Sequence, residues 1–220
     1  MNQSRRNVPL GRSRELFPEG SHICLIYSEE DERRLEIGSY LALGLAEGEQ
    51  VRYFADTTPP DEIHAWIQAM SLDVPPPPPR AAGAPASEAF EVFEARTVYC
   101  PSGTFVPDAM LRTLASCYDD AVKAGYAGAR LSGEMTWALR GIPGSERLVE
   151  YEALINVLVE LHPITAVCQY DARRFDGATI LDVLRVHPMM IVHGQIVRNP
   201  YYTRPSEFLA RHGASRQQGG

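Results

Sequence analysis

Short apolar runs alternate along the chain with longer segments in which apolar residues recur every three or four positions. The short runs predict buried strands, and the longer segments predict amphipathic helices. Strands are expected at residues 22–27, 49–55, 89–95, 127–133 and 164–170, with a strand or edge hairpin at 189–197. Helices are expected at residues 35–46, 61–70, 109–124, 146–161 and 175–186. This alternation predicts an α/β fold with a mostly parallel central sheet and helices on both faces.

The same pattern sets the expected domain boundaries. A chain of 220 residues with 45% hydrophobic side chains can bury a substantial core, so we expect one folded domain over residues 16–211. Residues 1–15 lack periodicity and contain several arginines, which predicts a flexible basic arm, and residues 212–220 are expected to form a flexible tail. Residues 74–88 contain a run of prolines, which predicts a semi-rigid loop insertion.

The first predicted strand, His22–Tyr27, stops at the acidic segment Ser28–Arg34, which opens the first helix. In a nucleotide-binding protein of this architecture, a glycine-rich loop ending in Lys-Ser or Lys-Thr would surround phosphate here. This chain instead has four carboxylates, which suit the positive end of the helix dipole and repel phosphate. The carboxylates are Glu29, Glu30, Asp31 and Glu32. The sequence therefore predicts a degenerate phosphate loop and no bound triphosphate.

Charge and cysteine usage narrow the function classes further. The formal net charge of −7 and the pI of about 5.4 argue against direct nucleic-acid binding. The four cysteines are far apart and form no Cys-x-x-Cys unit, so neither a zinc ribbon nor a redox motif is expected. We find no signal peptide and no apolar run long enough to cross a bilayer, so we expect a cytoplasmic protein without a membrane partner.

Aromatic and acidic residues follow several predicted strands, and ligands of open parallel sheets bind at the carboxyl ends of the strands. The residues at these ends are Tyr27, Ser28, Asp56, Glu134, Trp137, Gln169, Tyr170 and Asp171. We expect them to line a small-molecule pocket, because they combine apolar area with a few polar groups. No nucleophile and base pair is evident, so we expect neither an enzyme nor a cofactor. For Glu134 the alternative is a carboxylate satisfied by backbone N–H groups near a helix start.

Four histidine and cysteine residues could form a metal site, which is the interpretation that we favour less. His22 and Cys24 are two apart on a strand and point to the same face, and Cys168 or His187 would have to complete a ligand set. Buried cysteine and hydrogen-bonded histidine are commoner, so we expect these residues to surround the ligand pocket without a metal. Tyr201 is expected to pack against the sheet, or less readily to contact the ligand.

Several short motifs, in this order, resemble the MEDS domain, the methanogen/methylotroph DcmR sensory domain. The motifs are His22–Tyr27, Gly44–Glu49 leading into Tyr53, Arg130–Trp137, Tyr151-Glu152, Cys168–Asp171, His187-Pro188 and Asn199–Tyr202. The resemblance implies a RecA/KaiC-like fold that has lost its phosphate loop. It also implies a sensor of hydrocarbon derivatives or similar small organic molecules, of a kind found attached to DNA-binding domains and histidine kinases.

We therefore expect a non-catalytic sensory domain that binds a small organic ligand and regulates a partner protein or transcription. No helix-turn-helix or kinase segment follows in this sequence, so the expected partner is a histidine kinase, an anti-sigma factor or a transcription regulator. A homodimer is compatible with these features. Two alternatives stay open: a residual nucleotide-binding protein of the RecA type, and a protein-interaction module without a ligand.

Overall fold

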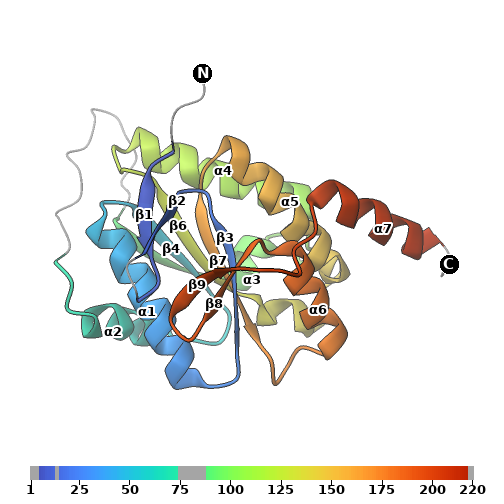
Figure 1. Ribbon diagram of the computed structural model, residues 1–220, viewed down its shortest axis with the longest axis horizontal. Coiled ribbons are helices and arrows are strands. Elements are labelled where there is room, and N and C mark those ends of the chain that lie inside the picture. The colour runs from blue at the N-terminus through green and yellow to red at the C-terminus, as the bar shows by residue number, and fades with distance from the viewer. Residues whose placement is uncertain (1–4, 13–14, 74–87, 218–220) are drawn as a thin grey trace.

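A seven-stranded sheet forms the centre of the molecule in a computed structural model, which describes residues 5–12, 15–73 and 88–217 (Figure 1). The strand order is β5-β4-β6-β7-β3-β8-β9. All neighbouring strands pair in parallel except β8 and β9, which form an antiparallel hairpin at one edge. The bounds are β3 (His22–Tyr27), β4 (Gln50–Ala55), β5 (Phe90–Glu94), β6 (Ala129–Glu134), β7 (Thr165–Asp171), β8 (Met189–Val192) and β9 (Gln195–Arg198). The mostly parallel sheet and its edge hairpin agree with the sequence-based prediction.

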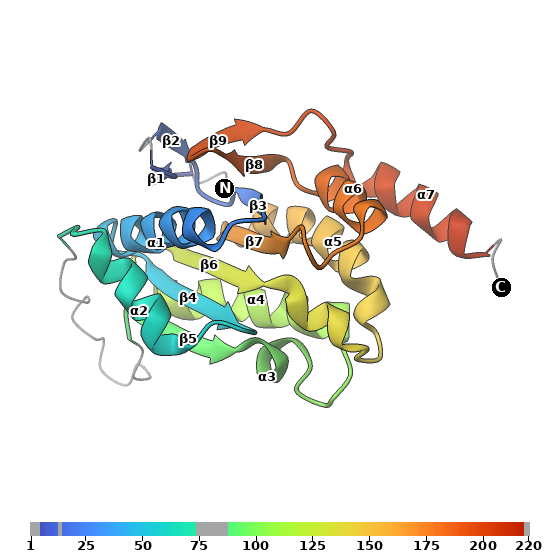
Figure 2. The same ribbon diagram turned by 90° about the horizontal axis from the view of Figure 1, so that it is seen from below.

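Helices cover both faces of this sheet, as predicted (Figure 2). One face packs on α1 (Glu30–Ala46) and α2 (Pro60–Ala69). The other face packs on α3 (Ala95–Tyr99), α4 (Pro107–Lys123), α5 (Leu148–Leu161) and α6 (Gly177–Val186). The short 3-10 helices η1 (Met135–Arg140) and η2 (Ser145–Arg147) lead from β6 to α5. Among the described residues no helix combines the length and apolar character needed to cross a membrane.

The two central strands show why the layers separate so cleanly. Side chains alternate across a strand, so successive residues of β3 and β7 enter different cores. Ile23 and Leu25 pack with α1, whereas Cys24 packs with Cys168 in the core below α5. Every residue of β7 is buried, which is expected for a central strand covered on both faces. Each strand therefore delivers side chains to two different sites.

The prediction of a flexible N-terminal arm is wrong for the residues that the structure describes. β1 (Asn7–Leu10) and β2 (Glu15–Pro18) form a separate antiparallel hairpin. Val8 and Leu10 are fully buried in the core that contains α1. Four-residue strands are too short to show a period, and their apolar residues stand among prolines and arginines. Part of the segment predicted to be a flexible basic arm is thus a folded hairpin that packs on the core around α1.

Other differences are local. Helix α7 (Pro205–Gln217) continues into the stretch for which a flexible tail was predicted. The five-residue helix α3 was missed because it is little longer than one turn. Helix α2 begins at Pro60, one residue before the predicted start, with Pro59 at the cap position and Asp61 in the first turn. The predicted proline-rich insertion lies almost wholly outside the described residues.

Candidate functional site

The predicted ligand residues do not converge on one pocket, because alternation along the strands divides them between two faces of the sheet. Tyr27, Glu134 and Gln169 lie on the α1 side, where Arg33 contacts all three. Tyr170 lies on the α5 side, where its hydroxyl group donates to Glu152. The single strand-end pocket expected from the sequence is therefore wrong in its membership. Two buried polar groups replace it.

The first group, which we call the Arg33 network, seals the carboxyl ends of the strands on the α1 side. It consists of Tyr27, Arg33, Tyr53, Thr57, Thr58, Ser132, Glu134 and Gln169. The centre of the network is the carboxylate of Glu134, which is only 2% exposed. One of its oxygens, Oε1, accepts from the Tyr53 hydroxyl at 2.8 Å. The other oxygen, Oε2, accepts from the backbone N–H of Asp56 at 3.0 Å and of Thr57 at 2.6 Å.

The Glu134 carboxylate is thus satisfied by backbone donors of the β4–α2 loop, close to the alternative that the sequence left open. Burial raises the pKa of this carboxyl group, but hydrogen bonds from residues 57–58, the Arg33 guanidinium and Tyr53 outweigh burial. The pKa consequently lies below its ordinary value. A carboxylate with so many donors holds the loop in place and has little capacity left to orient a ligand.

Arg33 closes the network from helix α1. Its guanidinium lies between the rings of Tyr27 and Trp66, at 5.1 and 5.0 Å from their centroids. It donates to Gln169 Oε1 at 3.2 Å and to Thr58 Oγ1 at 2.6 Å. An ion pair of 3.3 Å joins it to Glu134. A buried cation with this many acceptors is a positioning group that joins α1 to the strand ends.

The rim above this network is also occupied. Asp171 accepts from the Nε and Nη2 atoms of Arg173, at 2.8 and 2.9 Å, and Arg173 also donates to Glu30 at 3.0 Å. The hydrogen bonds from Arg173 outweigh partial burial and lower the pKa of Asp171. Only Ser28 and Glu29 connect β3 to α1, and both are exposed. The loop is therefore much shorter than one that wraps around a phosphate.

The second group, which we call the Glu152 cluster, lies on the α5 side of β3 and β7. It consists of His22, Glu152, Asn156, Cys168, Tyr170 and His187. The Tyr170 hydroxyl donates to Glu152 Oε1 at 2.7 Å. The other oxygen, Oε2, lies 3.0 Å from His22 Nε2 and 3.4 Å from His187 Nε2. It also accepts from the Cys168 thiol at 3.4 Å.

Burial shapes the protonation of this cluster. Burial and the nearby His187 lower the pKa of His22, although hydrogen bonds to Glu152 and Asn156 oppose the change. Burial alone raises the pKa of Glu152, but hydrogen bonds and charge from the two histidines outweigh burial and lower it. Burial, with the nearby carboxylate second, raises the pKa of the Cys168 thiol well above its ordinary value. Glu152 is therefore a carboxylate, and the Cys168 thiol keeps its proton.

The remaining predicted residues do not belong to either group. Trp137 stacks on Tyr99 with a centroid distance of 4.7 Å and is fully buried in the α5-side core. Cys24 donates its thiol hydrogen to Met189 O at 3.8 Å, and burial raises its pKa to about 12. Tyr201 is 61% exposed. These residues contribute to packing or surface.

Three central residues were missed: Arg33, Glu152 and Asn156. A signal was present for two of them, because Glu152 and Asn156 are one helical turn apart on the apolar stripe of α5. Polar residues on a buried stripe need partners, and this requirement would have pointed to them. Arg33 carried no comparable signal, since a charged residue in the first turns of a helix is normally exposed.

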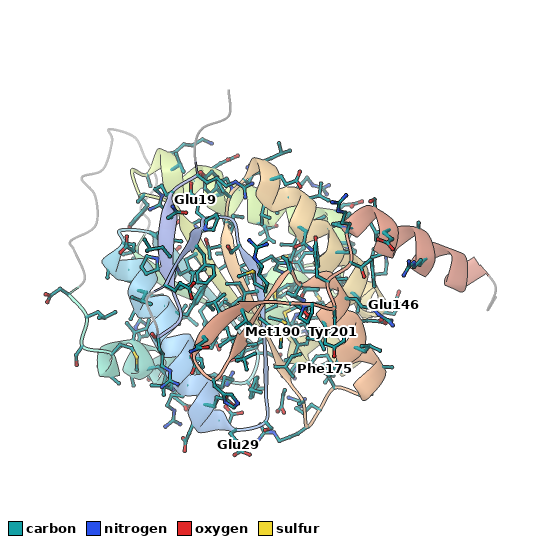
Figure 3. All side chains as sticks on the ribbon, viewed as in Figure 1. Glu19, Glu29, Glu146, Phe175, Met190 and Tyr201 are labelled. Carbon is teal, nitrogen blue, oxygen red and sulfur yellow. The ribbon has the colours of Figure 1, made fainter. Side chains whose placement is uncertain are left out.

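A cleft of about 730 Å³ opens at the other end of β3, between the N-terminal hairpin, α5 and the β8–β9 hairpin. In Figure 3, Glu19, which lines this cleft, is labelled at the top of the view, and Glu29, which precedes α1, is labelled at the bottom. The walls of the cleft include Phe17, Val159, Met189, Arg198 and Tyr202. His22 and Asn156 also line it, so the cleft reaches the edge of the Glu152 cluster. This position was not predicted, because the amino ends of parallel strands are not the usual ligand site.

The chain is similar to known proteins in sequence and in fold. The family model described as the MEthanogen/methylotroph, DcmR Sensory domain (MEDS) matches residues 21–188. The transcriptional repressor DcmR of Methylorubrum extorquens strain DM4 is 38% identical over 79 residues, which are 36% of this chain and 30% of the repressor. The matched part thus spans less than a third of that relative.

Solved structures with a similar fold include a KaiC-like protein from the hyperthermophilic archaeon Pyrococcus horikoshii OT3. It has a TM-score of 0.51 at 13% identity and covers 84% of this chain and 78% of its own. The flagellar accessory protein FlaH from Methanocaldococcus jannaschii has a TM-score of 0.50 at 12% identity, with coverage of 82% and 76%. At these identities the likeness concerns the fold alone, and it agrees with the predicted RecA/KaiC-like class.

Proposed function

The chain belongs to the MEDS family of sensory domains. We propose that it binds a small organic molecule without converting it chemically, and that binding changes its interaction with a partner protein. A sensory and regulatory role follows from the family and from the match to a transcriptional repressor. The ligand class we favour is a hydrocarbon derivative with one polar group.

The proposed ligand site is the cleft beside the amino end of β3. Its volume of about 730 Å³ is in the range of small-molecule sites, and its walls combine apolar side chains with many polar and charged ones. Phe17 and Met189 supply apolar surface, and Arg198 and Tyr202 supply hydrogen-bonding groups. The strand-end position first expected from the sequence is less suitable, because the Arg33 network fills it with mutually satisfied side chains.

The walls of the cleft also supply a route to a partner. The cleft is bordered by β8 and by residues that follow β9, so a ligand there contacts the edge hairpin directly. Gly11, which follows β1 in the N-terminal hairpin, packs near Gly194 and Ile196 of the β8–β9 hairpin, so the two hairpins are in contact. A ligand that binds better to one arrangement of the two hairpins would favour that arrangement, and a partner that reads this surface would respond.

A residual nucleotide site is the rival that the loop after β3 disfavours. Only two residues, Ser28 and Glu29, connect Tyr27 to Glu30, and acidic residues fill the first turn of α1. Phosphate would meet negative charge and few free backbone N–H groups in so short a loop.

Thermal unfolding of the purified protein with a panel of short-chain alcohols, amines and halogenated hydrocarbons tests the proposal. A compound at a hundred times its Kd should stabilise the fold by about 2.7 kcal/mol. The variant Phe17→Ala should bind the same compound more weakly. The matched control is Phe93→Ala, since Phe93 is a partly exposed phenylalanine on the far edge strand β5. Its binding should equal that of the wild type.

Titration with ATP and magnesium provides the opposing measurement. Binding of ATP at micromolar concentration would favour the nucleotide reading over ours. If no compound of the panel stabilises the wild type, or if both phenylalanine variants bind like the wild type, the cleft is not the ligand site. If no small molecule of the panel binds, the result would instead favour a protein-interaction module without a ligand.

A further inference from the structure

We propose that the Glu152 cluster is a buried site for one divalent transition-metal ion of the zinc class, with four ligands: His22, Glu152, Cys168 and His187. Their donor atoms, two imidazole nitrogens, a carboxylate oxygen and a sulfur, all lie within 4.8 Å of one another. Tetrahedral zinc with ligand bonds of about 2.0–2.3 Å separates its donors by about 3.3–3.8 Å. The separations of 3.0, 3.4 and 3.6 Å from His22 and Glu152 already approach this spacing.

The outer hydrogen bonds orient both histidines toward the proposed ion. His22 Nδ1 lies 3.2 Å from Asn156 Oδ1, and the Asn156 amide nitrogen donates to carbonyl groups including Val186 O at 2.7 Å. The asparagine oxygen therefore faces the histidine and accepts its Nδ1–H. His187 Nδ1 donates to Val183 O at 2.8 Å. Both Nε2 lone pairs then point inward, which is the arrangement that supports metal-binding histidines.

The interior of the cluster lacks a donor that this geometry requires. The buried Nε2 atom of His187 has no hydrogen-bond partner among the described residues. It faces Glu152 Oε2, which also faces the Nε2 lone pair of His22. A single proton can serve one of these two nitrogens only, and the other would remain unpaired at a cost of about 1–3 kcal/mol. One cation at the centre satisfies both nitrogens and the carboxylate together.

The donor set selects the class of metal. Thiolate and imidazole ligands favour zinc or a similar transition metal over magnesium or calcium, which prefer oxygen. On binding, the Cys168 S–H bond breaks, a sulfur–metal bond forms and the proton leaves to solvent. The charge of the ion then cancels the carboxylate and the thiolate, so the buried site is neutral. All four protein ligands are buried, which is typical of a closed structural site.

The ligands come from four separate elements, so the ion would join them. His22 and Cys168 are on neighbouring strands, Glu152 is on α5, and His187 directly follows α6. The cleft reaches His22 and Asn156, which gives the ion a path to the cluster. An ion at this position would hold the floor of the cleft and the start of the β8–β9 hairpin in one arrangement.

Metal analysis of the purified full chain, with no organic ligand present, tests this proposal separately from the sensory function. Mass spectrometric metal determination should find about one zinc-class ion per chain. After chelation, Co²⁺ should bind and give a thiolate-to-cobalt charge-transfer band. In Cys168→Ser the band should disappear, and affinity should fall by at least about tenfold.

Two other buried cysteines provide matched controls. Cys24 is the register partner of Cys168 on β3, and Cys117 lies on α4. The variants Cys24→Ser and Cys117→Ser should both keep the cobalt band. A wild-type protein that binds neither Zn²⁺ nor Co²⁺, or a Cys168→Ser variant with an unchanged band, would overturn the proposal. If Cys168→Ser does not fold, the wild-type cobalt spectrum decides alone: a thiolate band supports the site and its absence refutes it.

Discussion

Replacing Glu134 by glutamine should be one of the most damaging single changes in this protein. The carboxylate accepts hydrogen bonds from the Tyr53 hydroxyl, from backbone N–H groups of residues 56–58 and from Thr57 Oγ1. A glutamine side chain must turn an NH₂ group toward either the backbone donors or Tyr53 and Arg33. Removal of one partner from a buried ion pair costs about 3–5 kcal/mol. We expect the free energy of unfolding to fall by about this amount.

Urea unfolding followed by circular dichroism measures this loss. The matched control is Glu91→Gln, because Glu91 pairs with Arg52 at 3.1 Å in a partly exposed position. A partly exposed pair of this kind should contribute about 1 kcal/mol. A loss below about 1 kcal/mol in Glu134→Gln, or a loss equal to that of the control, would refute the view that this carboxylate holds the β4–α2 loop.

The pH dependence provides a second readout of the same carboxylate. Its pKa in the folded protein is lowered from the ordinary value of 4.5. The stabilisation is therefore complete above the pKa of the unfolded chain and is lost as the pH falls through the lowered pKa of the folded protein. The difference in stability between the wild type and Glu134→Gln should shrink over that acidic range. A difference that stays constant down to the acid transition would contradict the assigned shift.

Two further predictions concern packing. In Gly44→Ala the added methyl group would lie 2.5 Å from Cδ of the buried Arg130, so a loss of about 1–3 kcal/mol should exceed the gain in helix propensity. Gly177→Ala, where nothing lies within 4 Å of the added atom, is the control and should be neutral or stabilising by thermal unfolding. Leu10→Ala should cost about 2–5 kcal/mol in urea unfolding if the N-terminal hairpin belongs to the core. The exposed Leu16, changed to alanine, should cost less than about 0.5 kcal/mol, and equal effects would return the hairpin to the status of a loose arm.

The elements that sequence predicts well are those whose pattern is local and long. Strand β3 was placed at its observed bounds, and α5 within two residues, because each combines a continuous apolar run or stripe with clear end signals. The mostly parallel pairing of the strands also followed, since alternating strands and helices restrict the connections that a sheet allows, whereas the order of the strands was not predicted. Strand β1 was missed, because its burial depends on contacts with α1 that no local pattern records.

The site was harder to predict than the fold, for a physical reason. Gln169 and Tyr170 both stand at the end of a strand, and the sequence alone does not say which layer each one enters. Arg33 is buried only because Glu134, Thr58 and Gln169 together satisfy it. Such mutual satisfaction arises between distant segments and has no signal in any one of them.

Strand β7 also has a consequence for how this protein can change. Cys168 and Gln169 are adjacent in the chain, yet Cys168 contacts Glu152 and Gln169 contacts Arg33 on the opposite face. The sheet lies between the contacts of Cys168 and those of Gln169, so the two sets share no side chain. Substitutions at these two neighbours should therefore be additive, and the chemistry of one layer can diverge while the other is kept unchanged.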